Sequence, residues 1–255
     1  MGGKRYIVAD FELMQIEFLA LLAFGVAVLY SSVGHGGASG YLAAMALAGM
    51  APAEMKPTAL ALNILVAGLG TLRFLRAGLF EWRAFWPCAV GSIPFAFLGG
   101  ATVTADVTYK RILAVVLVLV AIALVTPIAK DRGGRTMPVW IGVGIGIVIG
   151  FVSGLIGVGG GIFLSPIIIL SGWASTRATS GIAALFILVN SVAGLAGNLA
   201  SLKALPDSLP WLAAAAFVGG LIGTELGARR LTPQWLRMLL SVVMVIAAFK
   251  LATSK

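Results

Sequence analysis

The sequence predicts an all-α polytopic membrane protein made of two homologous repeats of about five hydrophobic segments each. The first observation concerns composition. Of the 255 residues, 60% are hydrophobic and only 11% are charged, whereas soluble domains have about 25% charged residues. The second is a series of apolar runs near 20 residues, the length that crosses a hydrocarbon layer about 30 Å thick. The third is a glycine cluster that occurs once in each half of the chain.

Ten apolar segments follow one another along the chain, and we expect each of them to be helical. They cover residues 13–33, 38–51, 57–75, 84–103, 111–129, 138–157, 159–172, 178–199, 209–228 and 235–252. Eight of them are long enough to span a bilayer. The two short ones, 38–51 and 159–172, are second in each group of five and directly follow the glycine clusters, which predicts an internal repeat.

The two halves share a register. A shift of 123 residues places Gly157-Val158-Gly159-Gly160 on Gly34-His35-Gly36-Gly37. Small residues also recur every fourth position in the sixth segment, and their positions match small residues of the first segment: Gly146, Gly150 and Gly154 fall on Ala23, Ala27 and Ser31, with Gly142 one turn earlier. Such a stripe predicts close helix contacts, because packing drives helix association in lipid.

The repeats divide the chain into an N-terminal unit at 1–129, a polar connector at 130–137 and a C-terminal unit at 138–255. If each unit crosses the membrane five times, the second enters from the opposite side, which gives inverted repeats and is the arrangement that we favour. If the two short segments are re-entrant, the units run parallel. The Lys and Arg count of the connectors does not decide the orientation.

Charge and cysteine content exclude several classes of function. The net charge is +9, but the Lys and Arg residues lie in short connectors, where they set topology and contact lipid head groups, so we expect no nucleic-acid partner. Cys88 is the single cysteine and cannot form a disulfide within the chain. The spans hold no His, Glu and Asp cluster suited to a metal, so we expect no metal.

The two glycine clusters are the candidate substrate site. Irregular backbone at membrane depth is tolerated where it lines a cavity or is buried in protein. Each cluster precedes a short helix whose N-terminus presents unpaired N–H groups and the positive end of the helix dipole, which suits an anion. The candidate residues are Gly34, Gly36 and Gly37, and Gly157, Gly159, Gly160 and Gly161. The alternative is that these glycines only allow tight helix crossings.

The strings VGHGGASGYLAAMALAGMAPAE and IGVGGGIFLSPIIILSGWAST resemble the twice-occurring glycine motif of the TauE/SafE sulfite exporter family of bacterial membrane transporters. The resemblance covers the chain from Phe18 to Leu251 and implies export or uptake of a small sulfur-containing anion such as sulfite, sulfoacetate or a related organosulfonate. It also implies a location in the bacterial cytoplasmic membrane and no bound cofactor. The chain departs from an even repeat at His35, where the second half has Val158, and at Pro166, which the first motif lacks.

Six polar residues inside or beside the apolar segments complete the candidate site. His35, the only histidine, either binds the anion or couples its movement to a proton, or else caps a broken helix. Asn63 and Asn190 bind substrate oxygens or a neighbouring helix. Glu225 is a proton-coupling candidate or the partner of Arg229 in an ion pair. Lys56 and Arg177 attract the anion or reach the membrane interface.

These features predict a secondary transporter, and not an enzyme, that acts on a small inorganic or organosulfur anion within membrane lipids. The chain has no Walker motif, so ATP does not drive it directly. Two alternatives stay open: an anion channel that uses the same glycine sites, and a membrane-embedded protein without a transport function. The sequence leaves homo-oligomerisation open.

Overall fold

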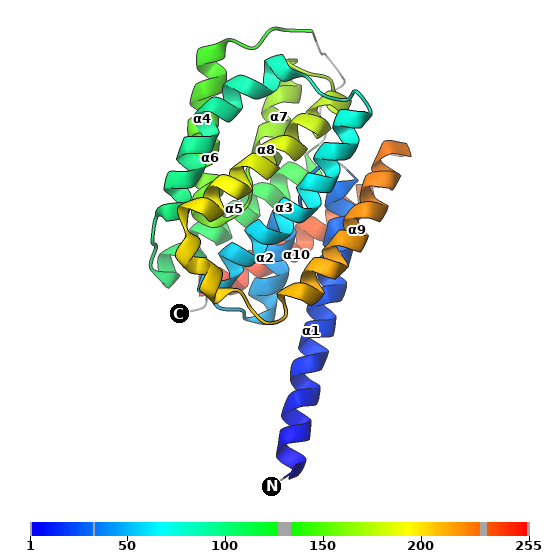
Figure 1. The fold of residues 1–255 in the computed structure, drawn as a ribbon, viewed down its shortest axis with the longest axis vertical. Coiled ribbons are helices and arrows are strands. Elements are labelled where there is room, and N and C mark those ends of the chain that lie inside the picture. The colour runs from blue at the N-terminus through cyan, green and yellow to red at the C-terminus, as the bar shows by residue number, and fades with distance from the viewer. Residues whose placement is uncertain (1, 33, 127–133, 230–233, 254–255) are drawn as a thin grey trace.

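The computed structural model of the protein describes residues 2–32, 34–126, 134–229 and 234–253, which form helices and connectors without a strand (Figure 1). The helices are α1 (Gly2–Ser31), α2 (Ala38–Ala48), α3 (Pro52–Arg76), α4 (Trp82–Ala101), α5 (Asp106–Val125), α6 (Val139–Ile156), α7 (Gly161–Ser171), α8 (Thr176–Gly197), α9 (Leu209–Arg229) and α10 (Gln234–Thr253), with a 3₁₀ helix η1 (Leu199–Ala204) before α9. All ten predicted segments are therefore helical. Residues 130–133 of the predicted connector lie outside the described residues.

The distribution of side chains is that of a membrane protein. Among the described residues, six helices are long and apolar enough to cross a bilayer: α3, α4, α5, α6, α8 and residues Leu209–Leu226 of α9. Large apolar side chains face outward, with Trp140 77% exposed and Phe249 72% exposed, whereas the amides of Asn63 and Asn190 are fully buried. This arrangement places apolar groups against lipid and satisfies polar groups inside the protein.

The two short helices have matching ends. Helices α2 and α7 each have 11 residues, which is about 16 Å at 1.5 Å per residue, or half of a hydrocarbon core. Each helix follows a glycine with positive φ and stops at another, Gly49 at φ 80° and Gly172 at φ 70°. At both helix ends, the backbone N–H of the residue after the terminal glycine donates to a carbonyl of the last helical turn, which is a Schellman motif.

The glycine stripe of α6 packs directly on the backbone of α4, as predicted. A Cβ atom added at Gly146, Gly150 or Gly154 would collide with the carbonyl oxygens of Cys88, Ser92 and Ala96, respectively. Because the residue numbers of these contacts rise along both helices in the same direction, α4 and α6 run parallel. Helices α1 and α9 also run parallel through such contacts, in which Gly219 meets the carbonyl of Phe24 and Gly223 that of Val28.

Helices α3 and α8 cross the middle of the molecule in contact with each other (Figure 1). Asn63 of α3 lies beside Ser191 of α8, and about two turns further along α3, Gly70 faces Ala184. Residue numbers rise along one helix as they fall along the other, so the two helices are antiparallel. The glycine breaks before α2 and α7 pack against this central pair.

Candidate functional site

The two glycine clusters adopt backbone conformations that other residues rarely adopt. In the first, which joins α1 to α2, Gly34 has φ 78° and Gly37 has φ 96°. In the second, between α6 and α7, Gly157, Gly159 and Gly160 have φ values of 89°, 81° and 79°. A side chain at these positions would be strained because positive φ brings Cβ against the backbone. The predicted helix breaks are therefore present, each directly before a half-length helix.

Asn63 links the two breaks to each other. Its Oδ1 accepts a hydrogen bond from the N–H of Ala38, the first residue of α2, at 3.0 Å. Its Nδ2 donates to the carbonyl of Val158 in the second break at 3.2 Å and lies 3.4 Å from Oγ of Ser191. One buried amide thus bonds to both breaks, and its partner Val158 lies 95 residues from Asn63 along the chain.

Gly36 and Gly159 lie against the same two side chains. A Cβ atom at Gly36 would collide with Oδ1 of Asn63 and lie 3.0 Å from Cγ2 of Ile187, and one at Gly159 would lie 2.7 Å from Nδ2 of Asn63 and 2.8 Å from Cγ2 of Ile187. Both breaks therefore meet at the centre of the protein and not at opposite surfaces. In this structure the side chains of Asn63 and Ile187 fill the space beside them.

Each break also packs on the central helix of the other half. Gly34 of the first break lies against the backbone of Ser180 in α8, and Gly157 of the second lies 3.1 Å, measured from its Cβ position, from the carbonyl oxygen of Lys56 in α3. Side chains larger than hydrogen would push α3 and α8 away from the breaks. The glycines thus serve both tight packing and the break itself.

His35 connects the first break to α7. Its Nε2 lies 3.3 Å from Oγ of Ser165, and the Ser165 hydroxyl donates its proton to the carbonyl of Gly161 at 2.8 Å. Because a serine has one hydroxyl proton, Nε2 of His35 donates in this pair and the Ser165 oxygen accepts. The backbone N–H of His35 donates to the carbonyl of Tyr30 at 2.9 Å, so His35 also closes the end of α1.

Lys56 and Arg177, the two candidate cations, lie in different surroundings. Lys56 is only 8% exposed, and its Nζ donates to the carbonyls of Gly100 at 2.9 Å and Gly99 at 3.4 Å in the last turn of α4. A cation there stabilises the negative end of the helix dipole. Arg177 is exposed in the first turn of α8 and does not meet Lys56.

Asn190 bonds within its own helix, and Glu225 pairs with a residue of another helix. The Nδ2 of Asn190 donates to the carbonyl of Phe186 one turn earlier in α8 at 2.8 Å, and its Oδ1 has no hydrogen-bond partner among the described residues. Glu225 forms an ion pair with Arg73, which joins α9 to α3, and both side chains are 40% exposed. The side chain of Arg229, the partner expected for Glu225, lies outside the described residues.

Sequence reasoning missed several buried hydroxyl groups near the breaks, among them Ser153 in the last turn of α6, Ser191 in α8 and Tyr41 in α2. Ser191 contacts Asn63, whereas Oγ of Ser153 and the hydroxyl of Tyr41 have no partner among the described residues. The only sign of them in the sequence is a hydroxyl residue within an apolar segment. That sign is weak, because a serine hydroxyl can also donate to a carbonyl of its own helix.

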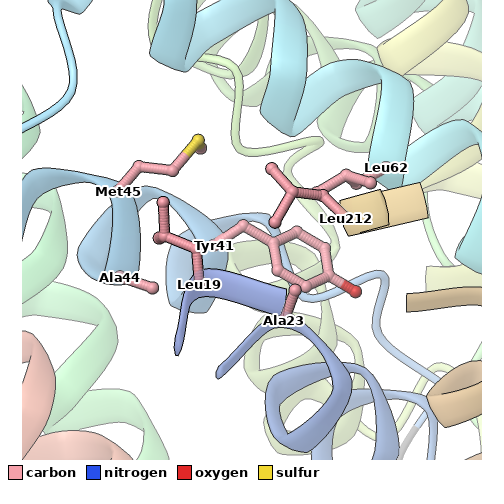
Figure 2. Close-up of a pocket in the computed structure, with 7 residues that line it drawn as sticks. All are labelled: Leu19, Ala23, Tyr41, Ala44, Met45, Leu62 and Leu212. Carbon is pink, nitrogen blue, oxygen red and sulfur yellow. The ribbon is translucent and has the colours of Figure 1, made fainter. Parts of the chain in front are cut away.

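One small cavity lies beside the first break, between α1, α2, α3 and α9. It is lined by Leu19, Ala23, Tyr41, Ala44, Met45, Leu62 and Leu212, with Tyr41 in the middle of the group (Figure 2). Its volume of about 10 Å³ is close to the smallest that holds one water molecule. Its apolar lining provides few hydrogen-bond partners for a water or an anion. Within the described part of the chain, no three His, Cys, Asp or Glu side chains gather at a metal site.

A fold of long apolar helices around two buried helix breaks is that of a multi-pass membrane protein. The chain matches the sulfite exporter TauE/SafE family over residues 19–251 and belongs to it. It is 42% identical over 238 residues, 91% of this chain and 96% of the other, to a probable membrane transporter protein, y4hK, of Sinorhizobium fredii (strain NBRC 101917 / NGR234). No solved structure matches the chain. The family is one of transporters and not of enzymes, and the bacterial source of this relative fits an inner-membrane location.

Proposed function

We propose that this protein is a secondary transporter of a small sulfur-containing anion, such as sulfite, sulfoacetate or a related organosulfonate. The anion binds where the glycine breaks of the two halves meet. The observation that carries the proposal is the Asn63 amide, which is fully buried and bonded to both breaks. Two half-helices that begin there direct their N-terminal N–H groups and dipoles toward one region.

The two halves are proposed to be inverted repeats, residues 1–129 and 138–255. The equivalent helices under the 123-residue register are α1 and α6, α2 and α7, α3 and α8, α4 and α9, and α5 and α10. Under this pairing the contact of α4 with α6 has its counterpart in that of α9 with α1. The antiparallel course of α3 and α8 is what inverted repeats require, and it supports this arrangement over parallel repeats.

Alternating access follows from this arrangement. Asn63 and Ile187 fill the space beside Gly36 and Gly159 in this structure. Movement of α3 against α8 opens the breaks to one side and then to the other. His35 and Glu225 are the groups that would couple this movement to a proton, since His35 contacts α7 and Glu225 joins α9 to α3.

The test is transport by the purified protein in liposomes. We expect sulfite uptake to saturate and to be accelerated by unlabelled sulfite or sulfoacetate inside the vesicles, because a carrier exchanges bound substrate in both directions. Flux that rises linearly with concentration, without counterflow, would instead indicate an anion channel. The absence of flux for sulfite, thiosulfate, sulfoacetate, taurine and sulfate would contradict the proposed substrate class.

A further inference from the structure

The N-termini of the two half-helices differ in one respect. At α2, the first N–H, that of Ala38, is capped by Oδ1 of Asn63. At α7, the matching first N–H, that of Gly161, donates to no acceptor among the described residues. The N–H groups on either side of it, of Gly160 and Ile162, also lack an acceptor there, as do those of Gly37 and Ser39 at α2. The side chain of Ile187 in α8 lies at the N-terminus of α7, with its Cγ1 2.6 Å from the Cβ position of Gly161. Because this side chain is an alkyl group, it cannot accept a hydrogen bond from the N–H groups there.

The second observation is a buried hydroxyl beside this uncapped N-terminus. Ser153 is 1% exposed, and its Oγ lies 3.3 Å from the Cβ position of Gly160, the N-cap residue of α7. This hydroxyl has no partner among the described residues. The carbonyl of Ser153 accepts from the N–H groups of Gly157 and Val158, so the backbone that carries this hydroxyl is fixed at the start of the second break.

Two more donors adjoin the same break. Nδ2 of Asn63 lies 2.7 Å and Oγ of Ser191 lies 3.2 Å from the Cβ position of Gly159, and both residues are fully buried. A buried polar group without a partner is destabilising, so natural proteins seldom keep one without a reason. A bound ligand with several acceptor oxygens would supply the partner that such a group lacks.

We propose that the anion binds at the N-terminus of α7 and not equally at both half-helices. The N–H groups of Gly160 and Gly161 and the hydroxyl of Ser153 bind its oxygens, with the amide of Asn63 and the hydroxyl of Ser191 beside them. At α2, the first helical N–H, that of Ala38, is already bonded to Asn63, whereas its counterpart at α7 has no such cap among the described residues. The inference rests on the proposed function and deepens it, because it makes Ser153 a specificity-determining residue for an oxyanion with three oxygens, such as sulfite or a sulfonate.

The experiment compares two variants that each remove one buried hydroxyl next to the N-cap glycine of a half-helix. Ser153→Ala acts at α7. Tyr41→Phe is the matched control at α2, since the Tyr41 hydroxyl lies 3.0 Å from the Cβ position of Gly37 and also lacks a partner among the described residues. Binding of sulfite and of sulfoacetate to the full chain in detergent is measured by calorimetry, and the melting temperature is measured without ligand.

We expect Ser153→Ala to weaken binding of both anions about 10- to 100-fold, as for loss of a hydrogen bond to a charged group. Its melting temperature should equal or exceed that of the wild type, because no partner is lost in the unliganded protein. Tyr41→Phe should bind as the wild type does. If Ser153→Ala lowers the yield of folded protein, Ser153→Gly removes the same hydroxyl and takes less space.

Unchanged affinity in the Ser153 variants, or an equal loss in Tyr41→Phe, overturns the assignment to α7 while the transport function stands. Failure of the wild type to bind either anion overturns the proposed substrate class, and the assignment with it. A lower affinity in Ser153→Ala alone supports the α7 site.

Discussion

The Oδ1 of Asn63 accepts a hydrogen bond of 3.0 Å from the N–H of Ala38, so a residue 25 positions along the chain caps the first half-helix. The same amide donates to the carbonyl of Val158 in the other half of the protein. The capping group of α2 is therefore also the link between the two breaks. Any movement that separates the halves has to break or exchange one of these bonds.

Replacing Asn63 with leucine should destabilise the protein by about 2 kcal/mol or more, because it leaves the N–H of Ala38 and the carbonyl of Val158 buried without partners. Transport should fall as well. The matched control is Asn190→Leu, since the Asn190 amide bonds only to a carbonyl of its own helix and its Oδ1 already lacks a described partner. Melting temperatures of both variants in detergent measure the difference, and equal losses would contradict the linking role of Asn63.

Gly36→Ala and Gly160→Ala should impair anion binding and transport. The added methyl collides with Asn63 at the first position, and at the second it is strained at φ 79° and lies 2.7 Å from Ile149. Gly49→Ala is the control, because Gly49 has φ 80° but no atom within 4 Å of its Cβ position. It should lower stability by about 1 kcal/mol through backbone strain and leave binding intact. Binding that survives in Gly36→Ala and Gly160→Ala would assign the glycines to packing alone.

Gly146→Leu and Gly150→Leu should lower the yield and melting temperature of folded protein before any effect on binding is seen. Both side chains would enter the contact of α6 with the carbonyls of Cys88 and Ser92 in α4, and close approach holds such helices together in lipid. Gly144→Leu is the control on the same helix, since nothing lies within 4 Å of its Cβ position. Detergent-extracted yield is the measurement, and a similar loss in Gly144→Leu would contradict this explanation.

His35→Ala should reduce the dependence of sulfite uptake on pH between about 5.5 and 8, because histidine is the side chain that changes charge near neutral pH. A protonated imidazole beside the break attracts the anion, so uptake by the wild type should rise as the pH falls. Ser165→Ala, which removes the acceptor of Nε2, should alter the same profile, and Cys88→Ala should not. A pH profile that is unchanged in His35→Ala would leave His35 with a structural role only.

Lys56→Gln separates a structural role of Lys56 from attraction of the anion. Glutamine keeps a donor for the α4 carbonyls but removes the charge, whereas Lys56→Met removes both. If the charge attracts substrate, both variants should raise the KM for sulfite by a similar factor, and only Lys56→Met should also lower the melting temperature. A normal KM in Lys56→Gln would confine Lys56 to the end of α4.

The sequence predicted the helices well because their signal is local. Apolar length, the charges between segments and the glycines at each break are read within about 20 residues, and all ten segments are helical in the structure. The close contact of α6 through its glycine stripe was predicted for the same reason, since a four-residue period places small side chains on one helix face. The partner of that stripe, α4, was not predicted, because it depends on which helices meet in space.

For the candidate site, the sequence by itself determined the glycine breaks, their half-helices and their shared register, since positive φ and a short apolar run are properties of neighbouring residues. Only the tertiary structure decided that both breaks meet at Asn63, that Asn190 bonds to its own helix, and that Glu225 pairs with Arg73. Asn63 and Asn190 look alike in sequence, as buried amides in apolar helices. They differ because a side-chain amide takes whichever partner lies within about 3 Å, and the packing of α3 against the two breaks sets that distance.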